Sequence, residues 1–101
     1  MKLTVEHRLI LGAILPDKGD RNTMIIKGDI VKKVEIKQED IEKYEIKAEG
    51  AAFSWNKDKD KGIDVEFTEL EIKIIKDTLD ELDKKKALDD NAMKIDKLFK
   101  S

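Results

Sequence analysis

The chain lacks cysteine altogether and is poor in several other residue types. Of its 101 residues, one is histidine, one is proline, and the aromatic residues are three phenylalanines, one tyrosine and one tryptophan. Without cysteine there are no disulfide bonds, thiolate metal sites or cysteine nucleophiles, and a reducing compartment suits the chain. The longest apolar run, residues 9–15, has seven residues, whereas a transmembrane helix needs about 20. We find no secretory signal either, and therefore expect a cytoplasmic protein without a membrane partner.

Charged residues, by contrast, are abundant, at 44 % of the chain. Their signs nearly cancel, because 21 basic and 23 acidic side chains leave a net charge of −2. A disordered chain typically combines low hydrophobicity with a large net charge. Here 40 % of the residues are apolar, and they recur with the periods of helices and strands. We therefore expect one folded, very soluble domain over residues 1–101, as the length suggests.

Two helices and a weaker third are predicted in the N-terminal half. Thr4 is a suitable N-cap for a helix over residues 5–15, and Pro16 ends it because the residue before a proline leaves the helical region. Asn22 or Thr23 is the expected N-cap of a second helix, which reaches residue 34 and has apolar side chains four residues apart. Residues 38–44 predict a short third helix with only two apolar side chains.

The apolar spacing then changes to every second residue, which is typical of strands with one wet and one dry face. This alternation predicts strands over residues 44–48, 53–55 and 63–67. In this interpretation Phe53 and Trp55 lie on the dry face, opposite the apolar side chains of the third strand. The charged segment KDKDKG, residues 57–62, is the predicted loop between the second and third strands.

Two further helices are predicted after the strands. Thr68 and Glu71 form a capping box, which begins a long amphipathic helix that reaches about residue 86. Asp89 or Asp90 begins a last helix, in which residues 92, 95 and 99 share an apolar face. The predicted fold is therefore α+β: two to three N-terminal helices, a small three-stranded antiparallel sheet and two C-terminal helices.

The residues needed for catalysis are scarce. His7 is the single histidine and has no serine or cysteine near it in the sequence, while Ser54 and Ser101 stand outside any nucleophile turn. The five glycines are dispersed and match no phosphate-binding loop. We therefore expect a protein that is not an enzyme and that needs no cofactor.

One segment has a spacing close to that of a calcium-binding loop. Its candidate ligands are Asn56, Asp58, Asp60 and Asp64. The glycine comes one position late, however, and the next acidic residue is out of register for a bidentate ligand. Three lysines inside the segment would also repel a cation. We therefore predict no metal site.

Nucleic-acid binding is the alternative function. Helices followed by a hairpin with a charged tip are the order of a winged helix, whose hairpin contacts the DNA backbone. The lysines that would contact phosphates are Lys57, Lys59 and Lys61 on the predicted hairpin tip, together with Lys32 and Lys33. Against this alternative, residues 39–45 of the would-be reading helix hold four acidic residues and one lysine. An acidic reading helix has the wrong sign, because phosphate neutralisation supplies most non-specific affinity.

Three stretches of the chain resemble small proteins encoded in the genomes of tailed phages and prophages. They are LILGAILPDKGD (9–20), KAEGAAFSWN (47–56) and DVEFTELEIKIIKDTLDEL (64–82). The shared order is an apolar first helix ending in LP and a glycine turn, a strand with WN, and a helix after a short acidic strand. The resemblance brings no activity and no functional residues with it. It implies a product in the host cytoplasm that binds a host protein, nucleic acid or signalling molecule without catalysis.

Partner binding is therefore the predicted function, in a host-takeover or anti-defence role. A host protein would need an exposed apolar patch, whereas a small signalling ligand would need a pocket lined by basic groups. Candidate residues for these contacts are Met24, Ile25 and Met93 for a protein, and Lys18, Arg21 and Lys27 for a ligand. A homo-oligomer suits either form, because small binding proteins often build a site across a symmetric interface.

Overall fold

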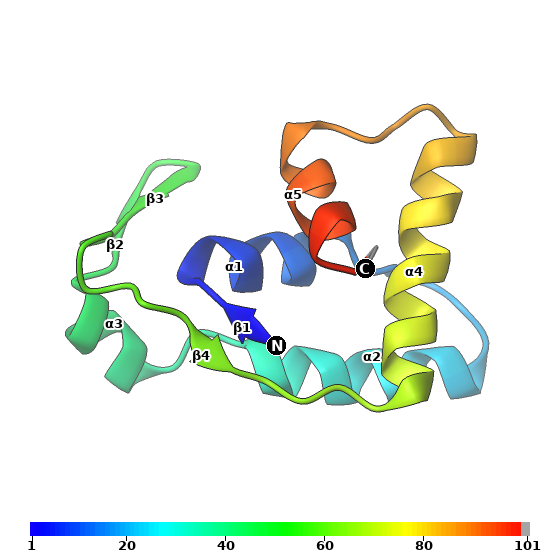
Figure 1. The fold of residues 1–101 in the computed structure, drawn as a ribbon, viewed down its shortest axis with the longest axis horizontal. Coiled ribbons are helices and arrows are strands. Elements are labelled where there is room, and N and C mark those ends of the chain that lie inside the picture. Colours follow the sequence, from blue (N-terminus) through cyan, green and yellow to red (C-terminus); the bar gives the residue numbers. More distant parts are fainter. Residues whose placement is uncertain (100–101) are drawn as a thin grey trace.

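The structure, a computed structural model, describes residues 1–99 (Figure 1). These residues form five helices and four short strands. Their order is β1 (Lys2–Leu3), α1 (Val5–Ile14), α2 (Arg21–Val34), α3 (Gln38–Tyr44), β2 (Lys47–Glu49), β3 (Ala52–Ser54), β4 (Ile63–Asp64), α4 (Glu69–Lys84) and α5 (Asp90–Phe99). The predicted α+β class is confirmed, and the short third helix forms at residues 38–44 as predicted.

Four helices enclose the core. α1 and α4 each pack against both α2 and α5 (Figure 1), and their apolar stripes meet in one cluster with Leu3 of β1 and Val65 after β4. The buried cluster consists of Leu3, Ile10, Leu11, Leu15, Ile30, Val34, Val65, Ile75, Leu79, Ala92, Ile95 and Phe99. Full burial of such a side chain contributes about 1.5–3 kcal/mol, so the amphipathic pattern of these helices accounts for their packing.

Capping side chains set the starts of α1 and α4. The Thr4 hydroxyl accepts a hydrogen bond from the His7 N–H at 3.3 Å, and the Thr68 hydroxyl accepts one from the Glu71 N–H at 3.1 Å. Both caps are confirmed, and each satisfies an N–H that the helix itself leaves without a partner. α4 ends at Lys84, two residues earlier than predicted, and the chain leaves the helix through Lys86, which has a left-handed φ of 55°.

α2 begins earlier than the sequence predicts. Asp20, rather than Asn22 or Thr23, is its N-cap, and the Asp20 carboxylate accepts a hydrogen bond from the Thr23 N–H at 2.8 Å. This bond lowers the pKa of the Asp20 carboxyl. Aspartate and asparagine cap helices about equally well, so the sequence alone did not decide among three neighbouring polar residues.

The predicted three-stranded sheet is wrong. The strands form two separate two-stranded antiparallel sheets, β1–β4 and β2–β3. Leu3 of β1 pairs with Ile63 of β4, and the Val65 N–H continues this ladder to the Met1 carbonyl at 2.8 Å. Residues at the start of the chain therefore occupy the place beside β4 that the alternating pattern assigns to residues 53–55. A strand of two residues is too short to show an alternating pattern, so β1 could not be predicted from periodicity.

Phe53 and Trp55 consequently lie in surroundings other than those predicted. Phe53 pairs with Ala48 in the hairpin and is 52 % exposed, so its predicted place on a dry face is wrong. Trp55 follows the end of β3 and is half-buried. The tryptophan is thus partly covered, but not by the side chains of β4 in a shared sheet.

The charged segment 57–62 is not the turn of a hairpin, because the strands before and after it belong to different sheets. It runs from β3 to β4 past the start of α1, where the Asp60 carboxylate accepts a hydrogen bond from the Val5 N–H at 2.9 Å. A carboxylate in this position is stabilised by the helix dipole. Gly62 has a φ of 82°, and a Cβ there would lie 3.4 Å from the Leu3 carbonyl oxygen, so the turn into β4 requires glycine.

A buried arginine joins the first three helices. Arg8 of α1 is 4 % exposed, and it donates from Nε to the Val34 carbonyl at 3.2 Å and from Nη2 to the Glu35 carbonyl at 2.7 Å. It thereby satisfies carbonyls at the end of α2 that no helix N–H can reach. The same guanidinium donates to both carboxylate oxygens of Asp40, at 3.3 and 2.9 Å. These bonds hold the pKa of Asp40, in the first turn of α3, below its ordinary value.

Candidate functional site

An apolar hollow of about 360 Å³ lies where the end of α1 meets the start of α2 and the C-terminal half of α4. We call it the α1–α4 groove. It is lined by Ile14, Pro16, Thr23, Ile74, Asp77, Thr78, Glu81, Leu82 and Lys85. The apolar members and both threonines are half-buried, whereas the three charged members are exposed. The groove therefore has a largely apolar floor and a charged rim.

The rim charges take part in ion pairs at the surface of α4. Lys73 donates to the Asp77 carboxylate at 3.0 Å, and the Lys85 Nζ lies 3.7 Å from a Glu81 carboxylate oxygen. All four side chains are more than half exposed, and exposed pairs at this helical spacing contribute only about 0.3–0.5 kcal/mol. The two carboxylates are therefore available to a cation brought by a partner.

The half-buried Thr78 hydroxyl on the floor has a partner within its own helix. The Thr78 hydroxyl donates to the Ile74 carbonyl one turn earlier in the same helix, at 2.8 Å. Because this bond stays within α4, the hydroxyl requires nothing from a bound molecule. The groove is therefore suited to an apolar group on its floor and to charged groups only at its rim.

Apart from Met93, the residues predicted for partner or ligand binding lie on or just before α2, the helix that closes one side of the groove. Ile25 is 58 % exposed, and Met24 is half-buried. The three basic candidates Lys18, Arg21 and Lys27 do not line the groove. Met24, Ile25, Arg21 and Lys27 thus lie on one helix, and their role in binding stays a prediction.

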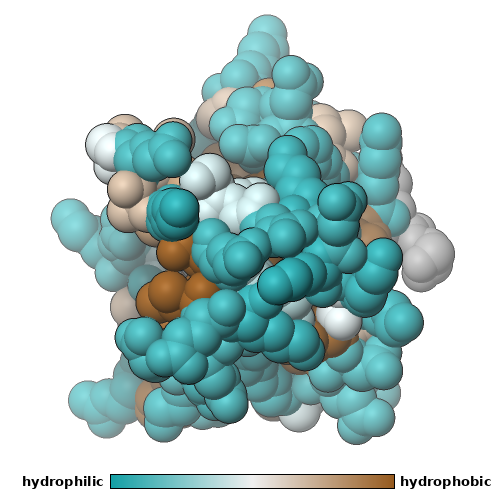
Figure 2. Space-filling view, turned by 90° about the vertical axis from the view of Figure 1, so that its left-hand side faces the viewer, coloured by the Kyte–Doolittle hydropathy of each residue, from teal (hydrophilic) through white to brown (hydrophobic). Residues whose placement is uncertain are grey.

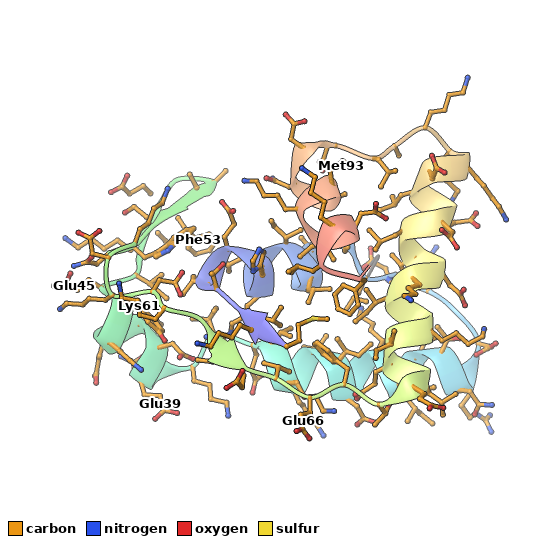
Figure 3. All side chains as sticks on the ribbon, viewed as in Figure 1. Glu39, Glu45, Phe53, Lys61, Glu66 and Met93 are labelled. Atoms are coloured by element: carbon orange, nitrogen blue, oxygen red, sulfur yellow. The ribbon has the colours of Figure 1, made fainter. Side chains whose placement is uncertain are left out.

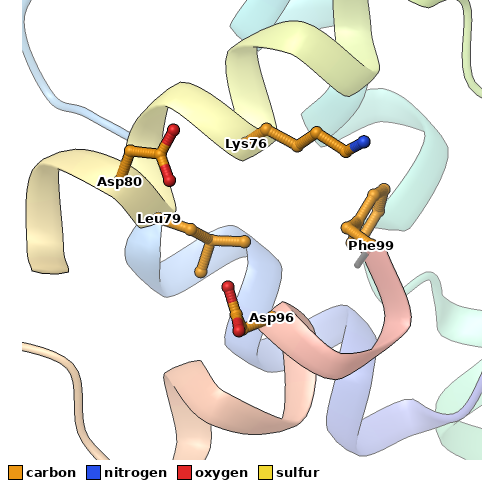
Figure 4. Close-up of a pocket in the computed structure, with 5 residues that line it drawn as sticks. All are labelled: Lys76, Leu79, Asp80, Asp96 and Phe99. Carbon is orange, nitrogen blue, oxygen red and sulfur yellow. The ribbon is translucent and has the colours of Figure 1, made fainter. Parts of the chain in front are cut away.

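A smaller hollow of about 190 Å³ lies between α4 and α5 (Figure 4). It is lined by Lys76, Leu79, Asp80, Asp96 and Phe99. Leu79 and Phe99 belong to the core, and the other three side chains combine one cation with two carboxylates. This mixture offers no uniform charge to an ionic ligand, so we assign no ligand to it.

Trp55 lies between two further hollows at the base of the β2–β3 hairpin. The Lys57 Nζ lies 5.6 Å from the centroid of the indole ring, a typical cation–π distance. The indole Nε1 is buried and has no hydrogen-bond partner among residues 1–99, which lowers stability relative to a paired donor. With its N–H buried and a lysine over its ring, Trp55 is a poor platform for stacking a ligand.

The lysines of the DNA-binding alternative have different surroundings. Lys33 donates to the Glu66 carbonyl at 2.8 Å and to the Glu71 carboxylate, while the Lys59 Nζ lies 3.7 Å from a Glu45 carboxylate oxygen. Lys32 and Lys61 are exposed. The face that carries α3 and the hairpin is mainly hydrophilic, with hydrophobic residues confined to small areas (Figure 2). Residues 57–61 are not a hairpin tip, but DNA binding itself stays a prediction.

The contact between Lys33 and Glu71 instead joins α2 to α4. Burial raises the pKa of the Glu71 carboxyl, but hydrogen bonds from Lys33 and Thr68 together outweigh this effect and keep the pKa below its ordinary value. Glu71 is therefore a buried carboxylate whose charge is satisfied inside the fold. Both of these hydrogen bonds are accepted by Oε1 of Glu71.

His7 is part of the α1 cap. Its Nδ1 accepts a hydrogen bond from the Thr4 N–H at 3.2 Å, and burial lowers the pKa of the imidazole despite the nearby Glu6 and Asp60 carboxylates. Among residues 1–99, no three histidine, cysteine, aspartate or glutamate side chains are grouped so that they could hold a metal ion. Asp60, one of the candidate ligands in the calcium-like segment, accepts a hydrogen bond from the Val5 N–H.

Sequence reasoning missed the groove residues of α4. The periodic pattern places Leu82 on the main apolar stripe and Ile74 beside it, and neither position indicates a hollow. The available signal was the width of the apolar stripe on α4. This stripe is wider than the surface that the two neighbouring helices cover. Met93, the third apolar candidate, lies half-buried on α5 (Figure 3) and outside the groove.

None of the helices formed by residues 1–99 is long and apolar enough to cross a membrane. Comparison with known proteins finds no matching family model, and no significant match among curated proteins or solved structures. The resemblance to phage and prophage proteins therefore stays a prediction, and a function for the groove has to be argued from its geometry.

Proposed function

We propose that this protein is a non-catalytic binding protein that holds a partner protein in the α1–α4 groove. The observation that carries the proposal is a half-buried apolar floor beside an exposed acidic rim on α4. Grooves between helices take up apolar side chains of a partner segment in many protein complexes. Recognition of a segment with an apolar anchor would use both the floor and the rim.

The rim indicates which residues accompany that anchor. Asp77 and Glu81 are four residues apart on α4 and therefore lie on the same side of the helix. Their present lysine partners are weakly held, so a basic side chain of the partner can take their place at little cost. We expect a partner segment in which a large apolar residue stands next to lysine or arginine.

A small anionic signalling ligand fits this groove less well. Lys85 is the one basic residue among those that line it, and it already faces Glu81. A ligand of that kind would have to bind near Lys18, Arg21 and Lys27 instead. In the phage setting that the sequence resemblance implies, we therefore favour a host protein as the partner, in the host cytoplasm and in a host-takeover or anti-defence role.

The variant Thr78→Phe tests the groove without touching the core. Thr78 is half-buried and bonds only within its own helix, so a phenylalanine fills the groove and leaves no polar group unpaired. Asp83→Phe is the matched control, because Asp83 is an exposed residue of α4 that does not line the groove. Both variants add the same side chain to the same helix.

Each tagged protein is used to capture partners from a bacterial lysate, and mass spectrometry identifies them. We expect the wild type and Asp83→Phe to capture one partner at similar levels. Thr78→Phe should capture at least about tenfold less of it, which corresponds to a loss of about 1.4 kcal/mol in binding free energy. Equal capture by Thr78→Phe would contradict a groove contact. A nucleotide that raises the melting temperature through Lys18, Arg21 and Lys27 would favour the small-ligand form instead.

A further inference from the structure

The β2–β3 hairpin stands apart from the helical core (Figure 1). All six of its strand residues are exposed. At its base, the Asn56 N–H donates to the Tyr44 carbonyl at 2.7 Å, and the Asn56 Nδ2 donates to the Glu45 carboxylate at 3.0 Å. A hairpin of two strands is only marginally stable in water, and a further strand or a packed face stabilises it. Among residues 1–99, no further strand joins this hairpin.

β3 lies within an uncharged stretch, which is unusual for this chain. Residues 50–56, GAAFSWN, have no charged side chain, although 44 % of the chain is charged. Natural sheets usually protect an edge strand with lysine, proline or a bulge, and β3 has neither lysine nor proline. No strand lies beyond β3 in the part of the chain that the structure describes. Its outer edge is therefore open to another strand.

The hairpin register directs the backbone of Phe53 to this open edge. Gly50 and Ala51 connect the paired residues Glu49 and Ala52, and the Gly50 φ of 64° suits the first central position of a type II′ turn. In a two-residue hairpin, the pair that flanks the turn is hydrogen-bonded and the next pair is not. The N–H and C=O of Phe53 therefore point away from β2.

We propose that a second copy of this chain pairs antiparallel with the outer edge of β3, about a two-fold axis at Phe53. Each Phe53 then lies opposite Phe53 of the second copy, and each Ala52 lies opposite Ser54 of the second copy. The two hairpins form one four-stranded sheet in which the Phe53 and Ala48 side chains of both copies share a face. Aromatic pairs in this position stabilise antiparallel sheets.

The charge pattern of the hairpin favours a second copy as the occupant. A two-fold axis brings each strand against itself, so a strand with charges of one sign repels its own copy. β3 avoids this repulsion because it is uncharged. Two copies of β2 could also pair, because Lys47 of one copy would lie opposite Glu49 of the other. The central residue of β2 is Ala48, however, so that pairing would bury no aromatic side chain. The edge of β3 is therefore the better self-complementary surface.

This pairing leaves the proposed function intact. The hairpin lies at one end of the molecule, whereas α4, which supplies most of the residues lining the α1–α4 groove, lies at the other (Figure 1). A dimer joined through β3 would carry two grooves that face outward. Loss of the dimer and loss of partner capture are therefore separate results.

Sedimentation velocity over about 1–500 μM, a range that suits association through a small interface, tests the pairing. We expect the mass to rise with concentration from 11.6 kDa toward twice that value. Phe53→Lys places like charges opposite each other across the axis and should keep the mass at the monomer value. Ala48→Lys, the matched control, adds the same charge to the same face two strands from the axis and should still form the dimer.

Circular dichroism shows whether both variants keep the helical fold, which the exposed positions lead us to expect. Amide hydrogen exchange adds a second readout, because the Phe53 N–H should become protected as the wild-type concentration rises. A wild type that stays monomeric throughout this range would overturn the proposal. So would Ala48→Lys disrupting the dimer as fully as Phe53→Lys, because that result would place the contact on β2.

Discussion

Replacing the buried arginine should lower the stability of the fold more than breaking a surface ion pair does. Arg8 donates to two carbonyls at the end of α2, those of Val34 and Glu35, and to both carboxylate oxygens of Asp40. Methionine at position 8 matches the apolar stem of the arginine but removes every hydrogen-bond donor of its side chain. The variant Arg8→Met therefore leaves the two carbonyls without the arginine, while the Asp40 carboxylate keeps its hydrogen bond from the Lys37 N–H at 2.9 Å.

The expected loss of stability follows from the burial of the ion pair between Arg8 and Asp40. Removing one partner of a buried ion pair typically costs about 3–5 kcal/mol. The Asp40 side chain is 15 % exposed, so water can compensate part of the loss, and we expect about 3 kcal/mol, toward the lower end of that range. A domain of this size is stable by about 5–15 kcal/mol, so the variant should still fold at room temperature.

Urea unfolding at pH 7, followed by circular dichroism, measures this loss. Lys73→Met is the control, because it breaks an exposed ion pair with Asp77 and should cost less than about 0.5 kcal/mol. The pKa of Asp40 is lowered in the folded state, so its contribution is complete above its unfolded pKa of about 3.9 and fades as the pH falls through the folded pKa. The difference in the free energy of unfolding between the wild type and Arg8→Met should therefore become smaller in acid. A loss below about 1 kcal/mol at pH 7, or an equal loss in the control, would refute this account of Arg8.

Two further predictions concern the charged segment after β3. Asp60→Ala removes the carboxylate bound to the Val5 N–H and should cost about 1 kcal/mol in urea unfolding, whereas Asp58→Ala should cost much less; equal losses would argue against a cap at the start of α1. For the DNA alternative, we expect no retention of duplex DNA at micromolar protein in about 150 mM salt, where non-specific binders have dissociation constants of about 1–100 μM. A salt-dependent mobility shift that is lost when Lys57, Lys59 and Lys61 are changed to alanine would favour DNA binding instead.

The helices could be predicted from the sequence because their signals are local. Thr4 and Thr68 stand directly before amphipathic stretches, and each side chain bonds an N–H three residues later. The boundaries follow from contacts within one turn, which the sequence displays in full. The start of α2 was an exception, since several neighbouring polar residues can cap a helix, and so was the end of α4, which comes two residues earlier than predicted.

The sheets and the groove could not be predicted because they depend on contacts between distant residues. β4 pairs with Lys2–Leu3, some 60 positions away, and a two-residue strand has no detectable period. The position of Arg8 inside the core was equally hidden, because its partners come from the ends of two other helices. Phe53 shows the same limit: an alternating pattern identified a strand correctly, but it did not reveal that both faces of that strand are exposed.

The proposed function is tested most directly by a photo-crosslinking amino acid introduced at position 78, in the floor of the α1–α4 groove, and compared with the same amino acid at position 83. Both positions lie on α4, and only the first lines the groove. After irradiation of bacterial cells that express each variant, we expect one prominent crosslink to a partner protein from position 78 and none from position 83. No crosslink from position 78, or equal crosslinks from both positions, would contradict the proposal that this groove holds a partner protein.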